Sequence, residues 1–264
     1  MGSTMLRPFL FGCFLLSVVL AEALGRTVLA QPDATLSDMA GTFWRLAKID
    51  GISEGEDNAV VRITEGSIDF SHPCFYSSYP FHYDLGTFGV SPSWNSEEKC
   101  AGRNRPLSGS LEKELRRTRH FQSSGTTLTF LDDRDQSLIS LIRLQPTGPE
   151  NRKWRIASYF DGGHLVPADS FGSIMPFVTF FGGYLDGSPG CGGFLGAYSL
   201  SGDRLKAGAT WLLAGWCSGD LKKRFRQNDL ITKSLNGDRH VALEGDRVVL
   251  RDDQGNLQLV LAPW

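Results

Sequence analysis

The sequence predicts an α+β protein that is mainly β and consists of two copies of one small module. Each module is expected to be a curved antiparallel meander, a partial barrel, with one helix packed on it. Three observations predict this architecture: two cysteine pairs with equal spacing, short strands joined by turns in both halves, and a single helical segment in each half.

Four cysteines follow the N-terminal leader, and they form two pairs with the same spacing. Cys74 and Cys100 are 26 positions apart, as are Cys191 and Cys217, and the second pair follows the first by 117 positions. A fixed offset shared by rare residues indicates an internal repeat. Four cysteines allow three connectivities, and the equal spacing favours one disulfide within each copy, Cys74–Cys100 and Cys191–Cys217.

Other landmarks repeat in the same order along the chain. A Trp-Arg pair opens each copy, at Trp44 and Trp154, and an Asp-Asp pair closes a hairpin near each end, at Asp132 and Asp252. The offsets are 110 and 120 positions, and such drift is expected when surface loops differ in length. The predicted domains are residues 38–145 and 152–264, joined by a linker, residues 146–151, that contains proline and glycine.

Short strands account for most of each copy. Three hairpins are expected, formed by residues 60–63 with 67–70, residues 126–131 with 137–142, and residues 247–250 with 257–261. The first has the turn pair Glu65-Gly66 between its strands, a typical hairpin connection. In the last strand, alternation places Leu257, Leu259 and Leu261 on one face, as a half-buried strand requires.

One helix is expected in each copy. Asp220 can cap a helix over residues 221–235, and its first-copy equivalent is the shorter segment 111–117, with Leu111 and Leu115 facing inward. Four apolar residues of the second helix fall within a stripe about 120° wide. They are Leu221, Phe225, Ile231 and Leu235.

The N-terminal residues 1–30 are expected to form an export signal. Arg7 precedes an apolar run, residues 9–21, and small residues offer cleavage sites after Ala23 or Ala30. An uncleaved anchor and a lipoprotein signal at residues 10–13 are the alternatives. The apolar run is shorter than the roughly 20 residues that span a bilayer, so no membrane span is expected once the signal is removed. The protein is therefore expected to be periplasmic or secreted, where disulfides persist.

Charge and motif content disfavour several functional classes. Without residues 1–30 the chain has 25 basic and 28 acidic residues, a net charge of −3, which does not suit nucleic acid as a partner. The five histidines lack the spacing of metal ligands, and no Gly-x-Ser-x-Gly nucleophile motif occurs. The acidic pairs at Asp132 and Asp252 suit hairpin turns, where Asp bonds the local backbone. We expect no cofactor, no metal and no enzymatic activity.

A family resemblance becomes visible in residues 187–205. This stretch has Cys191 within a glycine-rich run, then Gly196-x-Tyr198, then the turn Gly202-Asp203. It resembles the central motif of the META domain, the family of the bacterial heat-shock protein HslJ. Gly192 stands where that family usually has Asn, and the first copy lacks the glycines around its cysteine. The resemblance implies an exported or envelope-associated module without established catalytic activity, distantly similar to the cracked-barrel pilotins that hold lipid-like tails.

The first functional hypothesis is a non-catalytic tandem META protein that serves in binding, envelope maintenance or envelope stress. Its partner is unknown, with lipid or an envelope protein as candidates. The alternative is an exported small β-barrel protease inhibitor, because residues 40–46 resemble the opening of those barrels. The duplication argues against this alternative, since the inhibitor opening is expected only once.

Two features are candidate binding elements. An apolar-ligand wall is expected between the second helix and a facing strand, with plain core as the alternative. Its residues are Phe177, Phe181, Leu221, Phe225 and Ile231. The basic runs at residues 116–120 and 222–224 are interpreted either as solvated helix faces or as contacts for anionic lipid or lipopolysaccharide.

Overall fold

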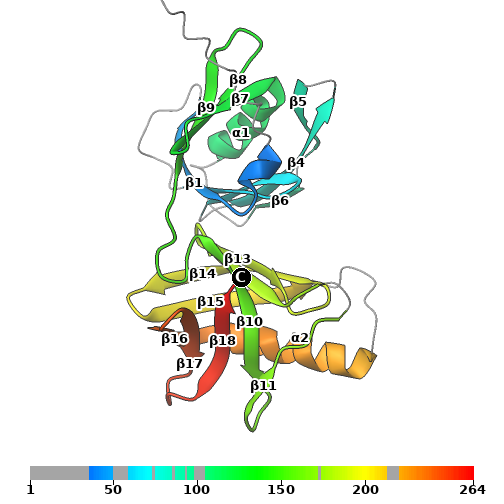
Figure 1. Cartoon of the computed structure of the whole chain (residues 1–264), viewed down its shortest axis with the longest axis vertical. Helices are drawn as coiled ribbons and strands as arrows, with labels where there is room; N and C mark the ends of the chain where they lie inside the picture. The colour runs from blue at the N-terminus through cyan, green and yellow to red at the C-terminus, as the bar shows by residue number, and fades with distance from the viewer. Residues whose placement is uncertain are drawn as a thin grey trace, which may run out of the picture. The chain divides into compact units, whose positions relative to one another are not determined.

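The computed structural model describes a mainly β chain in which antiparallel strands form two sheets (Figure 1). It covers residues 36–49, 59–72, 75–84, 87–92, 94–97, 105–171, 174–212 and 220–264, all of which belong to one compact unit. The expected export signal and three of the four predicted disulfide cysteines, Cys74, Cys100 and Cys217, lie outside these residues. None of the described helices has the length and apolar content that crossing a membrane requires.

The described residues of the first half build one nine-stranded sheet with the order β5-β4-β3-β2-β1-β9-β8-β7, in which β6 pairs with β4. Its strands are β1 (Phe43–Ile49), β2 (Val60–Ile63), β3 (Ser67–His72), β4 (Phe75–Asp84), β5 (Thr87–Val90), β6 (Trp94–Glu97), β7 (His120–Ser123), β8 (Thr127–Leu131) and β9 (Ser137–Arg143). A short 3-10 helix, Leu36–Met39, precedes them, and α1 (Arg105–Arg117) packs on β1, β5 and β9.

In the second half, the residues that the structure describes build another nine-stranded sheet, in which β10 pairs with β11, β12 and β18. Its strands are β10 (Arg152–Phe160), β11 (Leu165–Pro167), β12 (Phe177–Phe181), β13 (Tyr184–Ser188), β14 (Gly193–Ser201), β15 (Arg204–Leu212), β16 (Gly237–Glu244), β17 (Arg247–Arg251) and β18 (Leu257–Pro263). Pairing of β10 with β18 closes β10 and β12–β18 into a barrel, whereas the sequence predicted a partial one. Helix α2 (Leu221–Leu235) packs on β10, β15 and β18.

The opening strands of the two halves have the same register. Trp44 faces Arg143 across β1 and β9, and Trp154 faces Pro263 across β10 and β18. Each pair of strands then has a register shift at the same place, after Leu46 in the first half and after Ile156, 110 positions later, in the second. Both tryptophans are 1% exposed and belong to the cores of their halves. A shared bulge is a conserved feature of related folds, so this match supports the duplication hypothesis.

The hairpins and their turns form where the sequence predicted them. All three expected strand pairs are present, as β2–β3, β8–β9 and β17–β18. Asp132 Oδ1 accepts the backbone N–H groups of Arg134 and Gln136, each at 2.9 Å. In the second half, Asp252 Oδ1 likewise accepts the backbone N–H groups of Gln254 and Asn256, at 3.0 and 2.8 Å. The acidic pairs therefore have the predicted turn role.

Both helices lie near the predicted positions. Asp220 caps α2 as expected, and its carboxylate accepts the backbone N–H groups of Lys222 and Lys223. Helix α1 begins six residues before the expected start, at Arg105. Leu111 and Leu115 are fully buried in the first core, as the helical spacing predicted. Ile231 and Leu235 are buried in the second core in the same way.

Candidate functional site

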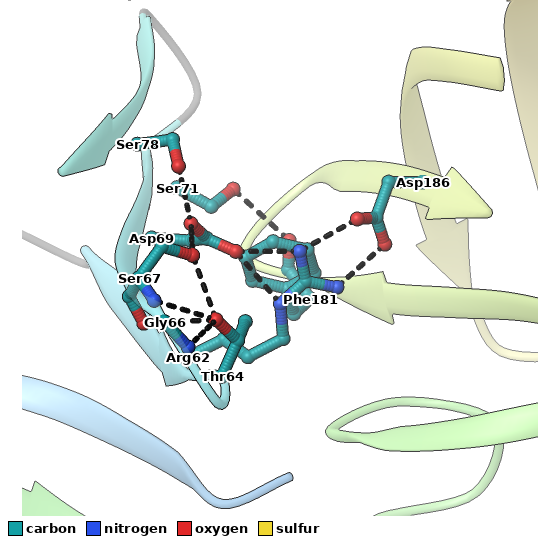
Figure 2. A network of polar contacts seen from close by, with 9 residues as sticks. All are labelled: Arg62, Thr64, Gly66, Ser67, Asp69, Ser71, Ser78, Phe181 and Asp186. Atoms are coloured by element: carbon teal, nitrogen blue, oxygen red, sulfur yellow. Dashed lines mark hydrogen bonds and ion pairs between the residues drawn. The ribbon is translucent and has the colours of Figure 1, made fainter. Parts of the chain in front are cut away.

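Arg62, on β2, is bound by two carboxylates, one from each half of the chain (Figure 2). Its Nε and Nη2 donate to Oδ2 of Asp69 on the neighbouring strand β3, at 3.0 and 2.6 Å. Its Nη1 and Nη2 donate to the two carboxylate oxygens of Asp186 on β13, at 2.7 and 2.6 Å. The guanidinium group thus joins the first sheet to the second through a bidentate pair, the strongest geometry for such a contact.

The ion pairs of Arg62 are largely removed from water. The side chains of Arg62 and Asp69 are 12% and 3% exposed, so Asp69 requires polar partners to offset its burial. Its Oδ1 accepts the hydroxyl groups of Ser67 and Ser78, at 2.8 and 2.7 Å. Burial lowers the pKa of Arg62, but the charges of Asp186 and Asp69 raise it well above its usual range. Arg62 is therefore a fixed positive charge between two negative ones.

Phe181 completes the contact between the halves. The Arg62 guanidinium carbon lies 4.6 Å from the centroid of the Phe181 ring, a cation–π distance. The same ring packs at 5.9 Å from Phe43 and 6.2 Å from Tyr76, both in the first half. The hydroxyl of Ser71 donates to the backbone carbonyl of Phe181 at 3.0 Å. Phe181 is fully buried in an aromatic cluster formed by both halves, so it does not line the predicted ligand wall.

A second feature is the polar side of α2, which holds two loops of the barrel. The Gln227 side chain donates to the carbonyls of Pro189 and Asp169, at 2.6 and 2.7 Å, and accepts the N–H of Asp169 at 2.9 Å. Asn228 donates to the carbonyl of Cys191 at 3.0 Å. Buried carbonyls need donors, and these amides supply them. Helix α2 therefore fixes the backbone around Cys191.

The burial of α2 corrects the predicted apolar stripe. Leu221 and Phe225 are 58% and 45% exposed, whereas Arg224, Gln227 and Asn228 are buried. The physical reason is the loop that packs under the first turns of the helix. Its buried carbonyls need hydrogen-bond donors, which the amide side chains of Gln227 and Asn228 provide and apolar side chains could not. Only the C-terminal part of α2 turns the predicted apolar residues inward.

Other exposed apolar side chains follow the loop that Gln227 holds. Ile174 and Met175 are 40% and 44% exposed, and Ile174 forms a β-bridge with Phe171. A Cβ placed on Gly190 would lie 3.3 Å from Phe171 and 3.0 Å from Gln227, so this loop adjoins α2. Three exposed cations lie on the first turns of the helix: Lys222, Lys223 and Arg226. We call these cations, together with the exposed Leu221 and Phe225 of the same turns, the α2 end surface.

The five residues of the predicted wall occupy four different environments. Phe177 packs against Trp264, with ring centroids 5.8 Å apart, and against the ammonium group of Lys153. Phe181 lies in the contact between the halves, Leu221 and Phe225 are exposed, and Ile231 is core. The structure does not bring them together around one apolar ligand.

The two predicted basic runs differ in what they contact. Arg116 pairs with Glu112 at 2.7 Å, and Arg117 pairs with the buried Glu114 at 2.6 Å. Arg119 donates to two backbone carbonyls. The run at the end of α1 therefore stabilises its own surroundings. In the second run Lys222 and Lys223 are exposed, which leaves them accessible to a partner.

Cysteine and histidine residues show no ligand cluster in the part of the chain that the structure describes. Cys191 is disulfide-bonded. Because Cys74, Cys100 and Cys217 lie outside the described residues, the pairing Cys191–Cys217 stays a prediction, as does Cys74–Cys100. His120 and His240 each contact an aspartate, at 2.7 Å from Asp135 and 2.9 Å from Asp203. These are exposed surface pairs.

Comparisons with known proteins identify no family and no function for this chain. No family model matches it, and no curated protein matches it. One NMR structure, of a protein from Burkholderia xenovorans, is 10% identical, covers 45% of this chain and 94% of that one, and has a TM-score of 0.34. A second NMR structure is 20% identical and covers 42% of this chain and 86% of that one, with a TM-score of 0.31. These similarities carry no information on function.

Proposed function

We propose that the chain is an exported, non-catalytic binding protein of the cell envelope, built from two META-like modules. The α2 end surface is its binding surface, and the ligand class is an anionic amphiphile such as an acidic lipid. The observation that carries this proposal is the combination of exposed Leu221 and Phe225 with the neighbouring cations of α2. Large exposed apolar side chains next to cations are typical of surfaces that contact anionic lipid.

The rigid support of this surface favours binding. Gln227 and Asn228 fix the loop that precedes and includes Cys191, and the disulfide of Cys191 restrains it further. A surface that is ordered before binding loses less conformational entropy when its partner arrives. Leu221 and Phe225 project from the capped first turns of α2, so their positions are set by the same contacts.

The charges on α2 fit an anionic headgroup layer. Lys222 and Lys223 are exposed next to the two apolar side chains, and Arg226 is 67% exposed one turn from Lys222. Arg226 reaches Asp161 only at 3.8 Å, a long contact that solvent screens. Cations near an anionic surface each contribute about 1 kcal/mol of attraction. Apolar insertion and charge attraction therefore act at the same place.

Vesicle flotation tests the proposal on the mature full chain. Wild-type protein is expected to float with phosphatidylglycerol vesicles and to stay behind with phosphatidylcholine vesicles. Leu221→Ser combined with Phe225→Ser should reduce binding about ten-fold or more, because two apolar side chains no longer leave water. Leu243→Ser is the matched control, since Leu243 is 57% exposed on β16, and it should bind normally. Equal loss in the control, or no wild-type binding, would contradict the proposed ligand class.

A further inference from the structure

The hairpins β2–β3 and β12–β13 occupy the same place in the two halves. Arg62 pairs with Asp69 across the first, and Thr179 pairs with Asp186 across the second. Each pair in one hairpin matches a pair in the other at a constant offset of 117 positions, the offset of the cysteines. The following strands, β4 and β14, keep this offset, since Ser78 faces Asp69 and Leu195 faces Asp186.

The outward sides of these two hairpins face each other. Arg62 and Asp69 project from the same side of the first hairpin and meet Asp186, which is the equivalent of Asp69 in the second. Ser71, also on this side, donates to the carbonyl of Phe181 at 3.0 Å (Figure 2). Its hydroxyl lies equally close to the carbonyl of Gly182, at 3.0 Å. A Cβ on Gly182 would lie 2.9 Å from the Ser71 carbonyl, so the two hairpins are in close backbone contact.

The opening strands of the two halves, β1 and β10, also occupy equivalent places beside these hairpins. Phe43 pairs with Arg62 in the first half, and Lys153 pairs with Thr179 at the equivalent position in the second. Phe43 packs on Phe181 of the second half, at 5.9 Å. Lys153 in turn lies close enough to the first half that its pKa, lowered mainly by burial, also responds to the charge of Arg62. The first of these equivalent strands therefore contacts the other half through Phe43, and the second places the charge of Lys153 within electrostatic range of Arg62.

We infer that the β2–β3 face is a homotypic docking surface: the same face of the module occurs twice in the chain, and the two copies bind each other. Interfaces that use the same patch on both partners are typical of two-fold dimers. The partner that this face fits is a second module of the same kind, and here it is supplied by the same chain. The inference does not depend on the proposed lipid ligand.

The two copies differ at the position of Arg62, at the centre of this contact. The position of Arg62 is occupied by Thr179 in the second half, which is 1% exposed. Two arginines facing each other would leave like charges close together in a buried site, which is unfavourable. A single arginine held by two equivalent aspartates avoids this. Fusion of the modules into one chain permits such asymmetry, because each copy can change separately.

Cleavage of the linker in the folded full chain tests the inference. A site-specific protease sequence is inserted between Gln145 and Pro146, which are both exposed, and the purified protein is cut. The halves of wild-type protein are expected to stay together in size-exclusion chromatography at micromolar concentration. In Arg62→Ala the dissociation constant of the cut halves should rise about a hundred-fold or more, because the buried Asp69 and the half-buried Asp186 lose their partner.

Two further variants keep this test decisive. Ser71→Ala removes only a contact between the halves and should weaken their association about five-fold, which provides a readout if Arg62→Ala does not fold. Arg45→Ala, at an exposed position of β1, should leave the association unchanged. Separation of the cut wild-type halves, or equal association of all variants, would overturn the inference.

Discussion

Arg62 and Asp186 are 124 positions apart in the sequence and form a bidentate ion pair with N–O distances of 2.7 and 2.6 Å. The pair is partly buried, and Phe181 covers one face of the guanidinium. This contact joins the two halves. Phe181 is buried within it and is therefore unavailable to a ligand. Binding is expected elsewhere, at the α2 end surface.

Arg62→Ala is expected to destabilise the full chain strongly. Removing one partner of a buried ion pair leaves uncompensated charge, and the loss should be about 3–5 kcal/mol in the free energy of unfolding. Urea denaturation followed by tryptophan fluorescence measures it. Arg45→Ala is the control, because Arg45 is exposed, and it should change stability by no more than about 0.5 kcal/mol. A loss below about 1 kcal/mol in Arg62→Ala would show that the pair contributes little.

Gly190→Ala is expected to disrupt the loop around Cys191. Gly190 has φ of +107°, and a Cβ there would lie 2.7 Å from the carbonyl oxygen of Asp169. Backbone strain and the clash together should reduce stability by about 2–4 kcal/mol, measured by thermal unfolding. Gly208→Ala is the control on β15, because a Cβ there meets no atom within 4 Å. If both variants unfold alike, the loop is not held as described.

Phe225→Ala and Ile231→Ala should separate surface from core on the same helix. Phe225 is 45% exposed and Ile231 is fully buried. Ile231→Ala should therefore cost about 2–5 kcal/mol of stability, whereas Phe225→Ala should cost less than about 1 kcal/mol. Denaturant titration of both variants under identical conditions measures the difference. Equal losses would place Phe225 in the core and remove it from the proposed binding surface.

The Asp132 turn predicts a dependence of stability on pH. Backbone N–H bonds from Gln136 and Arg134 lower the pKa of Asp132 below its ordinary value. The carboxylate therefore stabilises the fold above the unfolded pKa of about 3.9, and this stability is lost as pH falls through the folded pKa. Unfolding of wild type and Asp132→Asn from pH 2 to 6 should show a difference that shrinks towards low pH. A difference independent of pH would contradict this role.

Local structure was largely predictable from the sequence. The cap at Asp220, the helix that follows it and the hairpin at residues 60–70 depend on short-range patterns, and all three are present. Leu111 and Leu115 were also placed correctly, because the first core is apolar beneath α1. Helical periodicity failed at Leu221 and Phe225, because the helix there turns polar side chains towards loop carbonyls.

The contact between the halves could not be predicted from local patterns. Arg62 reads as an ordinary outward residue of a hairpin, and its ion pair with Asp186 arises only when two distant strands meet. One signal was available: Asp69 and Asp186 are separated by the same 117 positions as the cysteines. Barrel closure by β10 and β18 likewise depends on long-range pairing, which a sequence of alternating strands leaves open.

Native mass spectrometry of the protein purified from its own cell envelope tests the proposed function most directly. Wild type and Leu243→Ser are expected to retain an anionic lipid, and the variant carrying Leu221→Ser and Phe225→Ser is expected to lose it, since only that variant alters the α2 end surface. A lipid retained equally by all three proteins would place the site elsewhere. A retained protease in place of a lipid would contradict the account and favour the inhibitor hypothesis.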